Sequence, residues 1–176
     1  FAAVLDAIPL HLYEEDRFCG SCLGFSADSL PHGISETDYT AAADEQRRRG
    51  RRNFGAGFDH TLADYPVLLQ EGIGGRLERV ATERRRRTDE REMIFLDAVA
   101  ITLEAFSRFV IRHAECWETA FPDESEWTAS LRHIATDPPR TLREAIQFVW
   151  LVNIAFSSEA RQHNALGRMD QYLFHF

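Results

Sequence analysis

The sequence contains no lysine, so all 20 of its basic residues are arginines. We interpret this bias as the mark of a GC-rich gene. Acidic residues outnumber the arginines and the net charge is −8, which argues against a general nucleic-acid-binding protein. Two arginine-rich runs, at 47–52 and 83–87, are therefore interpreted as solvated helix ends, where cations complement the helix dipole.

Long apolar runs and cysteines are also scarce. No apolar run reaches the roughly 18 residues of a membrane-spanning helix, and no segment has the pattern of a secretory signal. We expect a cytoplasmic protein with neither a membrane nor a nucleic acid as partner. The three cysteines are an odd number, which argues against a disulfide framework. Cys19 and Cys22 have redox-motif spacing without a surrounding βαβ pattern, so we interpret them as structural thiols, and no histidine spacing predicts a metal site.

Strand patterns are almost absent, and the chain divides into two parts. With 176 residues it can bury one sizeable core. Residues 1–56 form an irregular segment rich in turn-forming residues. Within it we expect a short helix near 2–12, broken at Pro9, and another helix that begins at Thr37. Residues 57–176 form a helical region.

Four helices are predicted in the helical region. The first follows an N-cap candidate, Asp64, and breaks at the glycines of 72–75 before it continues. The second is long and follows a cap candidate at Thr88. The third is shorter, and the fourth opens at a capping box formed by Thr141 and Glu144. The predicted ranges are 64–87, 88–121, 123–136 and 141–157.

The long helix carries an amphipathic stripe, because apolar residues recur along it at spacings of 3, 4, 3 and 4. The stripe consists of Leu96, Val99, Leu103, Phe106 and Val110. Other apolar residues lie off the stripe, namely Ile94, Phe95, Ile101 and Phe109. We therefore expect this helix to be covered on more than one side.

The last helix is apolar on every face, which is typical of a helix in the middle of a large protein. We expect about half of this surface to need partners from beyond the 176 residues. One strand candidate follows, near 165–173. Because a lone strand leaves its backbone groups unpaired, it predicts neighbouring strands that the chain does not supply.

Two segments together resemble the glycyl radical enzymes of the pyruvate formate-lyase type. GFDHTLADYPVLLQEGIGG (57–75) is similar to a family stretch of Gly-His-Thr-x-x-Asp-Tyr, then Leu-Leu and a Gly-Ile/Leu pair. PPRTLREAIQF (138–148) and GRMDQYLF (167–174) resemble the family's Pro-x-Arg-Thr-x-x-Glu-Ala-x-Gln-Phe helix and Gly-Arg-x-Asp-Gln-Tyr strand. The resemblance covers roughly 57–176. It implies that 1–176 is a partial pyruvate formate-lyase-like domain, mainly α as given, ending in the first strand of a larger α/β barrel.

The resemblance also implies a reaction by thiyl-radical hydrogen abstraction from a small polar substrate. In the family a glycine on a C-terminal loop stores a radical, which a separate S-adenosylmethionine/iron–sulfur activating enzyme installs, and a cysteine on a second loop receives it. Neither the Arg-Val-x-Gly-Tyr pattern nor the cysteine-loop context occurs in this sequence. The chain alone is therefore expected to have no catalytic residue, bound cofactor or activity. The implied partners are the C-terminal barrel half, the activating enzyme, the substrate and a second copy in a homodimer.

Several residues match substrate-side positions of the family. Asp59, His60 and Asp64 cluster at a loop-to-helix junction, where a histidine either holds a turn or lies at the mouth of a pocket. His60 stands where pyruvate formate-lyases have an Arg that grips a carboxylate, and imidazole cannot form that bidentate clamp. This favours a diol dehydratase over a pyruvate lyase. The candidate substrate-binding residues are His60, Asp64, Gln162, His163, Arg168 and Asp170.

Three alternatives remain open at this point. Arg168 and Asp170 match the strand motif either as substrate contacts or as a buried ion pair that fixes the barrel geometry. The reaction is that of a lyase or dehydratase, or else that of a formate C-acetyltransferase of the same family. A helical interaction module without catalysis is the alternative from another class.

Overall fold

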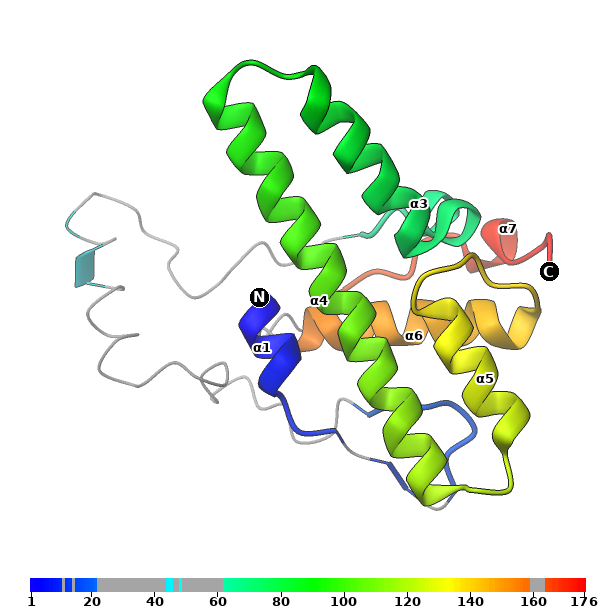
Figure 1. The fold of residues 1–176 in the computed structure, drawn as a ribbon. Coiled ribbons are helices and arrows are strands. Elements are labelled where there is room, and N and C mark those ends of the chain that lie inside the picture. Colours follow the sequence, from blue (N-terminus) through cyan, green and yellow to red (C-terminus); the bar gives the residue numbers. More distant parts are fainter. Residues whose placement is uncertain (11, 14, 22–43, 46–47, 49–61, 159–163) are drawn as a thin grey trace.

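The computed structural model describes most of the chain, and its fold is mainly α, as the sequence predicts (Figure 1). The described residues are 1–10, 12–13, 15–21, 44–45, 48, 62–158 and 164–176. Their helices are α1 (Ala2–Ala7), α3 (Tyr65–Arg86), α4 (Glu90–Ala120), α5 (Ser125–Ile134), α6 (Leu142–Ser157) and α7 (Met169–Tyr172). The four helices predicted in the helical region and the short N-terminal helix are confirmed. Most of the helix predicted from Thr37 lies outside the described residues.

α3 bends at Gly72, where the sequence predicts a break. The φ and ψ angles of Gly72 are 64° and 178°, and this left-handed φ favours glycine. A Cβ atom at this position would lie 2.7 Å from the carbonyl carbon of Asp137, in the loop between α5 and α6. The backbone N–H of Gly74 donates to the carbonyl of Thr136 in the same loop over 2.7 Å. The bend therefore fixes α3 to the rest of the fold.

α3 and α4 pack against one another. The end of α3, the connection at 87–89 and the first half of α4 form an arm that stands clear of α5 and α6 (Figure 1). α4 begins after Asp89, whose side chain accepts hydrogen bonds from the backbone N–H groups of Arg91 and Glu92. The predicted cap at Thr88 is thus wrong by one residue. A carboxylate at position 89 satisfies two N–H groups and also complements the positive end of the helix dipole.

α4 is covered on more than one side only over its second half. Phe109 is fully buried, as predicted. The same prediction is wrong for Ile94, Phe95 and Ile101, whose exposed fractions are 60%, 67% and 55%. These three residues belong to the arm, where α3 packs on one side of α4 and the opposite side stays exposed.

α6 is covered by the chain itself, so the expectation that half of its surface lacks partners is wrong. Five of its apolar residues are buried and three are half-buried, namely Phe148, Val149, Leu151, Val152 and Ile154, then Ile146, Trp150 and Phe156. From α4, the ring of Phe106 meets that of Phe148 edge to face, with centroids 5.8 Å apart. On another side, Cys19 of the N-terminal segment contacts Gln147 of α6.

The irregular N-terminal segment is held on α6 by two hydrogen bonds between the side chain of Gln147 and the backbone of Cys19. Gln147 accepts from the N–H of Cys19 over 2.6 Å and donates to the carbonyl of Cys19 over 2.8 Å. Burial raises the pKa of the Cys19 thiol far above its ordinary value, so this cysteine is structural, as predicted. Cys22 lies outside the described residues, and Cys116 is a half-buried free thiol.

The predicted strand near 165–173 has the wrong extent. Ala165 pairs with Leu62 in an isolated parallel bridge, but Met169–Tyr172 is the short helix α7. Gly167 turns the chain with a φ of 66°. One bridge cannot form a ladder, and the backbone groups that follow it are satisfied within a helical turn instead: the N–H groups of Gln171 and Tyr172 donate to the carbonyl of Arg168.

Candidate functional site

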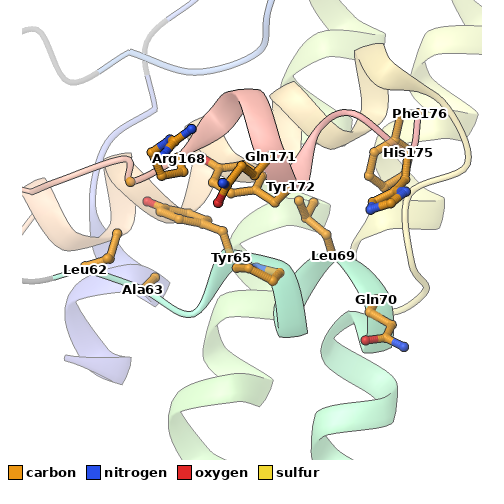
Figure 2. A pocket seen from close by; sticks show the side chains of 12 residues that line it. Leu62, Ala63, Tyr65, Leu69, Gln70, Arg168, Gln171, Tyr172, His175 and Phe176 are labelled. Atoms are coloured by element: carbon orange, nitrogen blue, oxygen red, sulfur yellow. The ribbon is translucent and has the colours of Figure 1, made fainter.

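The two motif segments meet at the parallel bridge between Leu62 and Ala165. Beside this bridge lies a cleft of about 720 Å³, between the start of α3 and the last residues of the chain (Figure 2). Its apolar lining includes Leu62, Tyr65, Leu69 and Tyr172. Its polar side chains are Gln70, Arg168, Gln171 and His175. Segments about a hundred residues apart in the sequence thus form one concave surface.

The start of α3 positions one wall of the cleft. The side chain of Asp64 accepts a hydrogen bond from the N–H of Val67, and Pro66 occupies the first turn, where its missing N–H leaves no partner unsatisfied. Tyr65 is thereby turned into the core and is only 1% exposed. Asp64, a predicted substrate contact, is therefore occupied as a helix cap in this structure.

Two stacked tyrosines join the walls. The rings of Tyr65 and Tyr172 lie 5.5 Å apart at an angle of 29°. The hydroxyl of Tyr172 donates to the carbonyl of Leu166 over 2.6 Å, which ties α7 back to the bridged segment. Burial raises the pKa of Tyr65 to about 12 and also raises that of Tyr172. Both phenols are therefore neutral near pH 7.

Arg168 brings a cation to the cleft. Its Nε and Nη2 atoms donate to the two carboxylate oxygens of Asp170 over 2.9 and 2.7 Å. This bidentate bond raises the pKa of Arg168 and lowers that of Asp170. The side chains are 69% and 65% exposed, so the two residues form the ion pair that was one of the two interpretations of the motif, but in this chain the pair is exposed rather than buried. Figure 2 shows Arg168 next to Gln171, with His175 at the other end of the cleft.

The other predicted site residues lie outside the described part of the chain. These are His60, Gln162 and His163. The predicted proximity of His60 to Gln162 or His163 therefore stays a prediction.

Sequence reasoning missed most of the cleft. Tyr65 and Tyr172 follow the Asp and the Gln of the two motifs, so the motifs themselves carried a signal for them. Gln70 and His175 gave none, because their place depends on how α3 and the last residues pack. In the described part of the chain no group of three His, Cys, Asp or Glu side chains could hold a metal ion. None of the helices described here has the length and apolarity needed to cross a bilayer.

Comparisons with known proteins agree with the two motifs. Residues 37–176 match the family model described as pyruvate formate lyase-like. The probable dehydratase YbiW of Escherichia coli (strain K12) is 29% identical over 163 residues, a match that covers 80% of this chain and 20% of YbiW. The chain thus spans about a fifth of the length of this curated relative.

Solved structures share the fold. The glycerol-bound form of the B12-independent glycerol dehydratase from Clostridium butyricum superposes with a TM-score of 0.76 at 18% identity, over 99% of this chain and 30% of that one. A glycyl radical enzyme from Archaeoglobus fulgidus gives a TM-score of 0.74 at 22% identity, over 99% of this chain and 31% of that one. The fold, the matched motifs and the family model agree, and the chain belongs to the pyruvate formate lyase-like family of glycyl radical enzymes.

Proposed function

We propose that this chain is the helical N-terminal portion of a glycyl radical dehydratase or lyase that acts on a small polar substrate. The observation that carries the proposal is the parallel bridge between Leu62 and Ala165, which brings both motif segments to one cleft. The names of two similar proteins, a probable dehydratase and a glycerol dehydratase, support the reaction class.

The candidate residues fall into two groups under this proposal. His60, Gln162 and His163 precede the bridged residues by two or three positions in the sequence and are proposed to bind hydroxyl groups of the substrate. Arg168 is proposed to bind an oxygen of the substrate, while Asp170 holds its guanidinium in a fixed orientation through the bidentate bond. Asp64 acts indirectly, by capping α3 and so placing Tyr65.

The radical chemistry belongs to residues beyond these 176. In such an enzyme the hydrogen-abstracting thiyl radical would form on a cysteine whose thiol hydrogen atom passes to the glycyl radical, but this sequence contains neither the glycine-loop motif nor the cysteine-loop context. The residues present do not fit the radical site, so no step through it is assigned to them. The proposed partners are the rest of the barrel, a radical-forming activating enzyme and a second copy in a homodimer. We expect the 176-residue chain alone to be inactive.

Formate C-acetyltransferase chemistry is the less favoured reaction. Position 60 holds His, and a pyruvate carboxylate is best bound by the bidentate guanidinium of an arginine. The match to this family argues against the third alternative, an independent interaction module.

An anaerobic assay of the full-length protein tests the proposal. After activation by the activating enzyme encoded in the same genome, small diols and polyols should be dehydrated and pyruvate should not be cleaved. Arg168→Ala should lower kcat/KM by roughly tenfold or more, as loss of a charge-assisted hydrogen bond of about 1.5–3 kcal/mol predicts. Arg79→Ala is a matched control, since it removes a surface arginine outside the cleft. Cleavage of pyruvate with no dehydration would overturn the proposal.

A further inference from the structure

Two of the three cysteines come together where the N-terminal segment contacts α4. The thiol of Cys19 donates a hydrogen bond to the backbone carbonyl of His113 over 3.4 Å. Cys116 follows His113 by three residues on α4, so the two residues share one face of the helix. The side chain of a helical residue leans towards the N-terminal end of its helix and covers the preceding turn. The side chain of Cys116 therefore leans over the turn that the Cys19 thiol contacts.

The position of Cys19 is fixed by α6. Its backbone N–H and carbonyl both bind the side chain of Gln147, and the indole N–H of Trp150 donates to the carbonyl of Gly20 over 2.8 Å. Gly20 also approaches α4 closely, since a Cβ atom there would lie 2.8 Å from Nε2 of His113. The backbone of Cys19 is thus held on α6 while its thiol is directed at α4. A group held in this way loses little further freedom when it forms a bond.

The two thiols differ in their access to solvent. Cys19 is fully buried. Cys116 is half-buried and lines a cleft of about 590 Å³ together with Leu12 and Thr119. Burial, and to a lesser extent the neighbouring thiol of Cys116, raise the pKa of Cys19 far above its ordinary value. Cys19 is therefore protected from reagents in solution, and Cys116 is the thiol of this pair that an oxidant can reach.

We propose that Cys19 and Cys116 form a reversible disulfide site, which closes when a peroxide enters the cleft and oxidises Cys116. In the first step the Cys116 sulfur attacks one oxygen of hydrogen peroxide and the O–O bond breaks. Cys116 becomes a sulfenic acid, and the other oxygen leaves with the thiol proton as water. In the second step the Cys19 sulfur attacks the Cys116 sulfur, the S–O bond breaks, and the hydroxide leaves with the Cys19 proton as water. The two thiols lose two electrons in total, and the peroxide is reduced to two molecules of water.

The disulfide would attach the N-terminal segment covalently to α4. Without it, Cys19 is held by hydrogen bonds alone, which open and close locally. With it, local opening of this segment is suppressed until a dithiol reduces the bond. The inference depends on packing among described residues and not on the reaction proposed above.

Peptide mapping of the full-length protein by mass spectrometry tests this proposal. The folded protein is treated with hydrogen peroxide, alkylated, and digested with trypsin without reduction. Because trypsin cleaves after arginine, the expected product is a linked pair of peptides, 18–47 and 113–132. Dithiothreitol should separate the pair. Oxidation of Cys116 to a sulfinic acid with no linked pair would overturn the proposal.

Cys22 provides the matched control, because it lies in the same tryptic peptide as Cys19. The linked pair should persist in Cys22→Ser and should be lost in Cys19→Ala and in Cys116→Ser. Fragment ions that separate residue 20 from residue 21 locate the linked cysteine in the wild type, so the test stands even if Cys19→Ala does not fold. A link made through Cys22 instead would contradict the proposal.

Hydrogen exchange measures the consequence of the link. Oxidation should slow the exchange of the amides of 15–21 in the wild type and in Cys22→Ser, because a covalent link suppresses local opening. It should have no such effect in Cys116→Ser. Unchanged exchange in a protein that carries the link would show that the disulfide does not hold the segment.

Discussion

Phe95 and Phe109 lie on the same helix, about four turns apart, and their surroundings are opposite. Phe95 is 67% exposed in the arm. Phe109 is fully buried in the body of the fold, by which we mean the second half of α4 and the helices packed around it. The body packs α4 against α1 and α5 as well as α3, while the arm has α3 alone among the described helices. An amphipathic pattern therefore identifies which faces of a helix are apolar, and the neighbouring chain decides which of them are covered.

The two regions differ in their ion pairs in the same way. In the arm, Arg84 pairs with Asp97, and their side chains are 38% and 55% exposed. In the body, Arg140 pairs with Glu144, whose side chain is 2% exposed. Glu144 also accepts the backbone N–H of Arg140 over 2.6 Å, in place of the N–H of Thr141 that a complete capping box would use. Thr141 accepts from the N–H of Glu144, as predicted.

The largest difference between the regions should come from the two phenylalanines. In the 176-residue chain, Phe109→Ala should lower the free energy of unfolding by about 3–5 kcal/mol, because it leaves a cavity in a packed core. Phe95→Ala should change it by no more than about 0.5 kcal/mol. Urea unfolding followed by circular dichroism measures both. Similar losses for the two variants would show that the arm and the body are not packed as described.

The bend in α3 should be the next most sensitive point. Gly72→Ala should cost about 1–3 kcal/mol, since it puts a side chain at a left-handed φ and 2.7 Å from backbone atoms of the loop after α5. Gly75→Ala is the matched control, with normal helix geometry and Glu71 Cβ as its close contact at 3.2 Å. That control should be neutral or gain up to about 1 kcal/mol from helix propensity. Thermal unfolding of the two variants measures this difference. If Gly72→Ala leaves the stability unchanged, the bend does not anchor α3.

The buried carboxylate of the body should give stability that depends on pH. Burial opposes ionisation of Glu144, but its bonds to Arg140 and Ser130 outweigh this and lower its pKa from 4.5 to about 2. Its contribution is therefore complete above about pH 4.5 and is lost as the pH falls towards 2. Glu144→Gln should cost about 1.5–3 kcal/mol at pH 7 and almost nothing near pH 2.

His113 also makes the stability depend on pH, equally in the wild type and in Glu144→Gln. Burial lowers its pKa from 6.5 to about 4, so both proteins should lose stability as the pH falls from about 6.5 towards 4. The difference between wild type and Glu144→Gln isolates the carboxylate. A difference that stays constant from pH 7 to pH 2 would show that Glu144 is not ionised in its pair.

The smallest effect should come from the ion pair of the arm. Asp97→Asn removes the charge that Arg84 binds over 2.9 Å, but exposed pairs contribute only about 0–1 kcal/mol. The change in unfolding free energy should be below about 0.5 kcal/mol and should disappear in 1 M salt. A loss as large as that of Glu144→Gln would mean that the arm is more tightly packed than its exposed side chains indicate.

The helices were predictable from local chemistry, and the site was predictable only in part. The bend at Gly72 and the helix caps at Asp64 and Thr141 depend on residues close by in the sequence, so local patterns were enough to predict them. The extent of the predicted strand was wrong, because pairing at Ala165 depends on Leu62, far away in the sequence. The prediction about the surface of α6 was wrong for a similar reason, since Cys19 and its neighbours fold back onto this helix.

The site residues show the same limit. Arg168 and Asp170 were identified by their motif, and the structure confirms that they pair. That the pair is exposed follows from the packing of α7 and could not be inferred from the motif. Gln70 and His175 carry no local signal and enter the cleft only through tertiary structure.

The most direct test of the proposed function is electron paramagnetic resonance of the full-length protein. After anaerobic reaction with the activating enzyme from its own genome and S-adenosylmethionine, the protein should show the signal of a glycine-centred radical. The 176-residue chain, treated in the same way, should show none. A full-length protein that carries both loop motifs, is fully folded and never gives that signal would contradict the assignment of this chain to a glycyl radical dehydratase or lyase.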